Sequence, residues 1–90
     1  MSFPINLEAE IRRRLDALAA STINLEDESA QHAGHAGASS GGHFRLTIVS
    51  SRFEGLNPVA RHRLVYQTLG DLMQNGIHAL AISAYTPEEF

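Results

Sequence analysis

The sequence predicts a two-layer α+β sandwich in the order α-β-β-α-β, a three-stranded mixed sheet with both helices on one face. Three observations support this fold class. Two segments carry apolar residues at helical spacing, three others alternate apolar and polar residues as strands do, and an asparagine stands before each helical segment. The first two strands can pair antiparallel, and the third, reached through a helix, can join the second in parallel by a right-handed crossover.

The first helix is expected over residues 7–20, with Asn6 as its N-cap. One helical face carries the apolar residues Leu7, Ile11, Leu15 and Leu18. A short strand follows over residues 22–28, where Ile23 and Leu25 alternate with polar side chains.

Residues 29–42 are dominated by glycine, alanine and serine and show no apolar periodicity. A tight hairpin needs far fewer residues, so we expect a long flexible loop between two strands. His32 and His35 lie within it, and His43 stands at its exit. The loop histidines are either simply solvated or part of a site, because long loops in compact domains are often functional.

The clearest strand follows the loop, where Phe44, Leu46 and Ile48 alternate with polar residues. A turn is expected over residues 50–57, and Gly55 can adopt a positive φ there.

The second helix is expected over residues 58–74, since Asn57 can cap it and proline suits its first position. Its core stripe consists of His62, Val65, Leu69 and Leu72. Asn75 and Gly76 end it.

The third strand is expected over residues 77–85. Strict alternation places Leu80 and Ile82 on the same face as His78. The other face then carries Ile77, Ala79 and Ala81. The sequence Thr-Pro-Glu-Glu over residues 86–89 is typical of a fresh helix start.

Composition bounds the function. Ninety residues predict a single domain, residues 1–90, and the absence of cysteine excludes a disulfide scaffold or a thiol nucleophile. A net charge of −3, with all seven cations arginine, argues against a dedicated nucleic-acid module. No nucleophile motif or phosphate-binding loop is present, so we do not expect an enzyme. With neither a membrane span nor a secretory signal, a cytoplasmic location is the default expectation.

Five histidines are the main candidates for chemistry. His78 opens the third strand, and the loop histidines can fold near it, which makes a site for a borderline metal such as zinc, copper or iron. The spacing of His32 and His35 alone is a weak signal, since it also produces adventitious metal binding. His62 lies on the apolar stripe of the second helix, so we expect it to be structural and half-buried with a backbone partner.

Four spaced segments resemble the BolA family: SRFEG at 51–55, RHRLVY at 61–66, IHAL at 77–80 and TPEEF at 86–90. The similarity covers nearly the whole chain, and several motifs in the right order make it specific. The resemblance implies an α-β-β-α-β fold similar to class II KH domains, in agreement with the element order above.

The resemblance also implies that the chain pairs with a monothiol glutaredoxin and shares a [2Fe–2S] cluster, in iron-sulfur cluster trafficking or iron-dependent regulation. The histidine of the family's third-strand motif is a cluster ligand and matches His78. The second ligand is His32 when counted from Asp27-Glu28-Ser29, or His43 when counted back from the next strand, with His35 less favoured. The partner's cysteine and glutathione would supply the thiolates, so this chain alone holds no cofactor.

Some bacterial BolA proteins are DNA-binding transcriptional regulators, and the resemblance offers that function as the alternative. A small basic patch of Arg52, Arg61 and Arg63 is the candidate surface. The G-x-x-G clamp of KH domains is absent, since the corresponding turn, residues 54–58, reads EGLNP.

Overall fold

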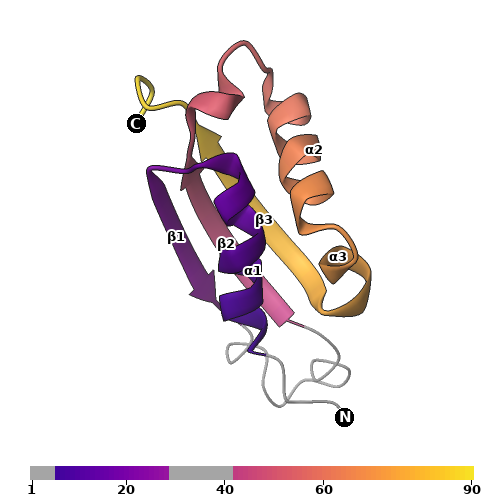
Figure 1. Cartoon of the computed structure of the whole chain (residues 1–90). Helices are drawn as coiled ribbons and strands as arrows, with labels where there is room; N and C mark the ends of the chain where they lie inside the picture. The colour runs from indigo at the N-terminus through magenta and orange to yellow at the C-terminus, as the bar shows by residue number, and fades with distance from the viewer. Residues whose placement is uncertain (1–5, 29–41) are drawn as a thin grey trace.

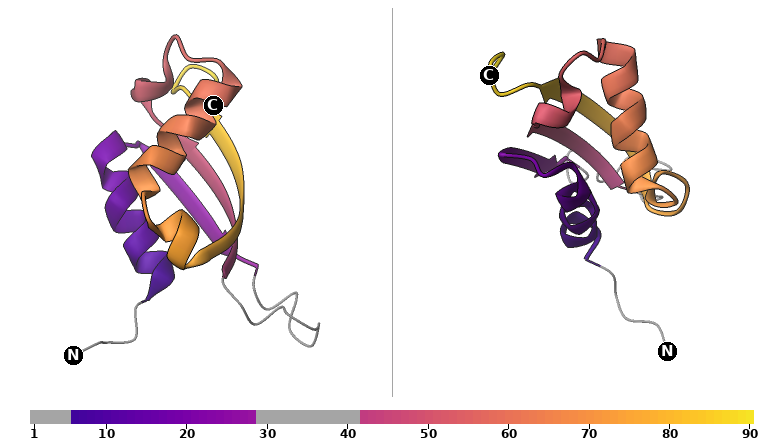
Figure 2. Two further views of the ribbon diagram at one scale, coloured as in Figure 1. Left: turned by 90° about the vertical axis from the view of Figure 1, so that its right-hand side faces the viewer. Right: turned by 45° about the horizontal axis from the view of Figure 1, so that its top comes forward.

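The chain forms a three-stranded sheet with its helices packed against one face, as Figures 1 and 2 show. The computed structural model describes residues 6–28 and 42–90. The elements in chain order are α1 (Leu7–Leu15), β1 (Thr22–Asp27), β2 (Gly42–Val49), α2 (Pro58–Leu69), α3 (Leu72–Asn75) and β3 (Ile77–Tyr85), with 3₁₀ turns at Asp16–Leu18 and Ser51–Phe53. The predicted fold class is confirmed.

The strand order in the sheet is β1-β2-β3. β1 runs antiparallel to β2, with Thr22 opposite Val49 and Asp27 opposite Phe44. β3 runs parallel to β2, as expected for a strand reached through a helical crossover.

The core lies between the helices and the facing side of the sheet. Its buried members come from every major element: Ile11, Leu15, Leu18, Leu25, Phe44, Leu46, Ile48, Phe53, Val65, Leu69, Leu72 and Ile77. The side chains of β2 alternate between this core and the opposite face, as the sequence predicts for a half-buried strand.

The first helix begins as expected and ends earlier. The Asn6 side chain accepts a hydrogen bond from the Ala9 N–H at 3.1 Å, so the predicted cap is confirmed. The α-helix stops at Leu15 instead of continuing to Ala20, because the chain tightens into a 3₁₀ turn and Ala19 then adopts φ 50°. The apolar stripe still reaches the core, because that turn buries Leu18.

The second helix is divided, and the single helix predicted over residues 58–74 is wrong. Asn57 caps its start through the Ala60 N–H at 2.8 Å, but the helix breaks at Gly70, whose φ is 59°. Arg14 of α1 donates to the Leu69 carbonyl at 2.8 Å and to the Asp71 carboxylate at 2.6 Å. The break is therefore stabilised from the neighbouring helix, since Arg14 satisfies a carbonyl that the helix leaves open.

The last residue of the loop predicted over residues 29–42 is part of a strand. Gly42 belongs to β2, where it is buried. The rest of that segment lies outside the described residues, and His32 and His35 lie there with it. Gly55, in the turn before α2, has φ 79° as predicted.

The C-terminal segment forms a turn and no helix follows, although the capping contact typical of a helix start at residues 86–89 is present. The Glu89 side chain accepts from the Thr86 N–H at 2.9 Å, as in a capping box, and the Glu89 N–H donates to the Thr86 carbonyl at 3.0 Å. Glu89 also pairs with Arg61 of α2 at 2.6 Å, which ties this turn to the helix layer.

Candidate metal centre

Two of the predicted metal ligands meet at one end of the sheet. His43 is the second residue of β2, and His78 is the second residue of β3. Because these neighbouring strands are parallel, both enter the sheet at the same end. The imidazole centroids lie 5.0 Å apart, with the rings tilted by 39°. His78 is exposed and His43 half-buried, so the pair faces solvent.

A β-bulge sets the direction of His78. Gly42 lies opposite Ile77, and the next residue of β2, His43, lies opposite Ala79, so β3 carries one extra residue at His78. Ile77 is buried in the core, whereas His78 is exposed. The prediction that His78 shares the face of Leu80 and Ile82 is therefore wrong, because the bulge interrupts the alternation after Ile77.

Two glycines, Gly42 at the start of β2 and Gly76 just before β3, are closely packed. The Gly42 N–H donates to the Gly76 carbonyl at 2.9 Å. A Cβ atom at Gly42 would lie 2.3 Å from the Phe44 ring, and one at Gly76 would lie 3.0 Å from Leu7. Glycine is thus required at position 42, since no side chain fits there without displacing Phe44.

The chain before the histidine pair is held against β2. The Glu28 N–H donates to the His43 carbonyl at 2.7 Å, which extends the pairing of β1 and β2 by one residue. The Glu28 carboxylate pairs with Arg45 at 3.2 Å. The cation two residues after His43 therefore has its own counter-ion.

The two imidazoles are close enough to bind the same metal ion. A metal–nitrogen bond is about 2.0–2.1 Å, so one ion can reach rings whose centroids lie up to about 6 Å apart. Within residues 6–28 and 42–90, no group of three or more His, Cys, Asp or Glu side chains is placed to hold a metal ion. Imidazole suits iron, copper and zinc, and the described residues therefore offer an incomplete donor set for such a metal.

His62 lies in a different part of the molecule. It is half-buried on α2, where it lines a surface hollow of about 340 Å³ with Val59, Arg63 and Tyr66. Its ring makes no hydrogen bond to the described part of the chain, so the backbone partner expected for it is not found. Its exposure also separates it from Val65, Leu69 and Leu72, which are buried as predicted.

The three arginines of the predicted basic patch have different surroundings. Arg61 donates to the carbonyls of Leu56 at 2.8 Å and Ala84 at 3.1 Å, and pairs with the Glu89 carboxylate. Arg61 above all, and then the Thr86 N–H, lowers the pKa of Glu89 to about 2. The charge of Arg61 is thus balanced by Glu89 within the fold.

Arg52 and Arg63 are the exposed members of that patch. Neither forms an ion pair with any residue that the structure describes.

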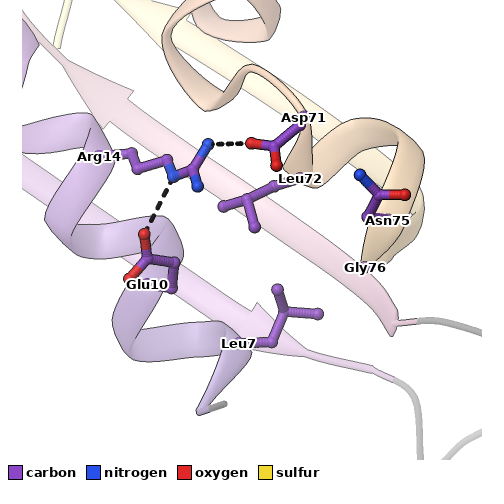
Figure 3. A pocket seen from close by; sticks show the side chains of 7 residues that line it. All are labelled: Leu7, Glu10, Arg14, Asp71, Leu72, Asn75 and Gly76. Carbon is purple, nitrogen blue, oxygen red and sulfur yellow. Dashed lines mark hydrogen bonds and ion pairs between the residues drawn. The ribbon is translucent and has the colours of Figure 1, made fainter. Parts of the chain in front are cut away.

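A cleft between α1 and α3 was missed by the sequence reasoning. It encloses about 460 Å³, and Figure 3 shows its lining: Leu7, Glu10, Arg14, Asp71, Leu72, Asn75 and Gly76. Glu10 accepts hydrogen bonds from Arg13 and Arg14, which lower its pKa to about 2. The helix break at Gly70 positions Asp71 for this cleft, and no helical periodicity signals that contact.

The sequence and the fold were compared with those of known proteins. A family model described as BolA-like protein matches residues 15–89. BolA-like protein 1 of Mus musculus is 46% identical over 85 residues, which cover 93% of this chain and 61% of that protein. The chain belongs to the BolA-like family. It spans about three fifths of the length of such relatives.

Other relatives carry different descriptions. The DNA-binding transcriptional regulator BolA of Vibrio cholerae is 53% identical over 68 residues, covering 76% of this chain and 62% of that protein. The BolA domain of SufE1 from Arabidopsis thaliana superposes with a TM-score of 0.82 at 42% identity, covering 98% of this chain and all of that one. In the described residues, no helix has the length and apolar character needed to cross a membrane.

Proposed function

We propose that this BolA-like chain binds a monothiol glutaredoxin and shares a [2Fe–2S] cluster with it through histidine ligands. The observation that carries the proposal is the adjacency of His43 and His78, with ring centroids 5.0 Å apart at one end of the sheet. Two imidazoles beside each other, with no third ligand among the described residues, fit a site that a partner completes. The absence of cysteine fits as well, because the partner and glutathione would provide the thiolates.

His78 is the first ligand in this proposal, and the second is an imidazole on the β2 side. The ring distance favours His43. His32 is the alternative that family resemblance suggests, with His35 less favoured, and both lie outside the described residues. Imidazole in place of thiolate on one iron raises the reduction potential of such a cluster.

The histidines bind a metal only as neutral imidazoles, so protons compete with the metal for the site. The chain orients its half of the site by the bulge at His78. The proposed role is non-catalytic, in cluster trafficking or iron-dependent regulation, and we place it in the cytoplasm.

Co-expression with a monothiol glutaredoxin tests the proposal. The purified complex should show the visible absorption and circular dichroism of a [2Fe–2S] centre, and His78→Ala should remove most of that signal. His43→Ala and His32→Ala identify the second ligand, because only one of them should change the spectrum as strongly. His62→Ala is the matched control, since this histidine lies on α2 away from the pair. An unchanged spectrum with His78→Ala would refute the ligand assignment.

DNA-binding regulation is the second candidate, favoured by the similarity to the DNA-binding transcriptional regulators BolA of Vibrio cholerae and Haemophilus influenzae. In this chain the exposed cations Arg52 and Arg63 carry it, while Arg61 is engaged within the fold. Footprinting at physiological salt should show a defined site that is lost in Arg52→Ala/Arg63→Ala. Binding that shows no sequence preference, or none at all, would count against this function.

A further inference from the structure

Two hydrogen bonds near the end of β3 show which of its backbone groups point away from β2. The Tyr85 carbonyl accepts from the Ser50 N–H at 2.9 Å, so Tyr85 faces β2. The Ala84 carbonyl accepts instead from the Arg61 side chain at 3.1 Å, so Ala84 faces away from β2. Because successive residues of a strand point their backbone groups to opposite sides, Leu80 and Ile82 also face outward.

β3 is an edge strand, since the sheet order is β1-β2-β3. No strand in the described part of the chain pairs with its outer side, and the N–H and C=O groups of Leu80 and Ile82 make no hydrogen bond to the described residues on that side. Figure 2 (left) looks toward this side of the sheet, with β3 at its margin. An edge with unpaired backbone groups is a template for another strand.

Natural edge strands are usually protected by charged side chains, proline, bulges or a covering element. β3 has the sequence IHALAISAY, with no proline and no Asp, Glu, Lys or Arg over nine residues. The bulge at His78 closes one end, and Arg61 caps the Ala84 carbonyl at the other. An open window therefore remains over residues 79–83.

The two faces of β3 carry side chains of different size. Leu80 and Ile82 pack against the core, beneath the helix layer. Ala79, Ala81 and Ser83 are exposed on the opposite face. Their small side chains leave space for larger residues of an added strand, which would be β-branched or aromatic at alternate positions.

We propose that the partner that completes the histidine site also adds an extended, uncharged segment to the free edge of β3. This inference rests on the proposed function. The open window begins directly after His78, and a strand rises about 3.3 Å per residue, so Leu80 lies only about 7 Å further along. One partner can therefore supply the remaining cluster ligands beside His78 and also pair its backbone with that of Leu80 and Ile82. This second interaction is known as β-strand addition.

A second copy of this chain fits the edge less well than a single extended segment. α2 packs over the β3 side of the sheet (Figure 2). Strands pair about 4.8 Å apart, whereas packed helices need about 8–10 Å between their axes. Antiparallel pairing of β3 with its own copy would place both α2 helices on the same face of the joined sheet, where they would crowd each other.

Amide hydrogen exchange in the cluster-bearing complex with a monothiol glutaredoxin tests the inference. In the free chain, the outward amides of Leu80 and Ile82 should exchange much faster than the ladder amides of Ala81 and Ser83. In the complex, exchange at Leu80 and Ile82 should slow by at least about tenfold. Leu25, whose amide faces outward on β1, is the internal control and should not change.

A matched pair of variants probes the same surface. Ser83 and Thr47 lie opposite each other, Ser83 on the edge strand and Thr47 on the central strand. Ser83→Lys should weaken the complex by about tenfold, since a lysine on an edge opposes strand addition. Thr47→Lys should weaken it less.

The outcomes separate the two proposals. Cluster spectra with unchanged exchange at Leu80 and Ile82 would overturn strand addition and leave the proposed function standing. Failure to form any cluster complex would overturn both. Protection of the same amides in the isolated chain, with a dimer mass by light scattering, would assign the edge to a second copy and overturn the partner segment.

Discussion

The two outer strands of the sheet differ in how their edges are protected. β1 carries Glu26 and Asp27, and Arg12 of α1 donates to its outward Ile23 carbonyl at 3.4 Å. β3 has no charged residue, and Arg61 covers only the Ala84 carbonyl near its end. Both edges expose backbone groups, but only the β3 edge leaves them beside small, uncharged side chains. The sheet can therefore accept an additional strand beside β3, whereas charged residues oppose one beside β1.

The histidine pair lies at the beginning of the open edge. His78 belongs to β3, and His43 lies on the central strand beside it. The acids of β1 lie across β2 from that edge, and Arg45 of β2 stands opposite Glu26. The comparison indicates that both the candidate ligands and the open backbone groups favour an approach from the β3 side.

The largest expected effect distinguishes inward from outward backbone groups on β3. Ala81→Pro removes an N–H that faces β2 and should lower the free energy of unfolding by about 2–4 kcal/mol. Ala84→Pro removes an outward N–H and should cost about 1 kcal/mol or less, because edge positions tolerate proline. Urea denaturation measures both. Equal losses would contradict the assignment of the outer edge.

A smaller effect concerns the contact that closes the open edge at its far end. The pKa of Glu89 is lowered from 4.5 to about 2, chiefly by Arg61 and then by the Thr86 N–H. A depressed carboxyl pKa stabilises the fold above the unfolded value, so stability should fall as the pH drops from about 4.5 toward 2. Glu89→Gln removes this contribution, and its stability should decline less steeply over that interval.

Thermal unfolding at several pH values measures the difference between wild type and Glu89→Gln. Glu10, whose pKa is lowered to about 2 by Arg13 and Arg14, remains in both proteins and accounts for part of the acid loss. Parallel curves for the two proteins would show that the Arg61–Glu89 pair contributes nothing to folding.

The smallest effect is expected at the edge of β1. Glu26 is exposed, so Glu26→Thr should change the free energy of unfolding by no more than about 0.5 kcal/mol. The same variant should make β1 a better template for association, which light scattering at increasing protein concentration detects. Unchanged association would mean that Asp27 and Arg12 are sufficient to protect this edge.

Features determined by local chemistry could be predicted from the sequence. Asn6 and Asn57 cap their helices through the N–H three residues on, an interaction that needs only the residues nearby. The third strand was also predicted with its observed bounds, and the positive φ of Gly55 followed from its place in a turn. These residues act within a few positions of the chain.

Features that depend on tertiary contacts could not be predicted in the same way. Gly70 was a visible signal for a break, yet the continuing apolar stripe to Leu72 suggested one helix. Arg14 stabilises the break from more than fifty residues away. At the candidate site, the sequence left His32 and His43 as alternatives for the second ligand beside His78. The distance between the His43 and His78 rings depends on the fold and could not be predicted.

The extra residue at His78 decides which face of the sheet the later side chains of β3 occupy. If all nine residues of β3 alternated without a bulge, every residue after His78 would lie on the opposite face of the sheet, because Ile77 is buried. Leu80 and Ile82 would leave the core, and Ala79, Ala81 and Ser83 would enter it. Deletion of His78 would instead restore regular alternation and keep Leu80 and Ile82 on the core face, so the core can do without the extra residue and only the histidine pair requires it.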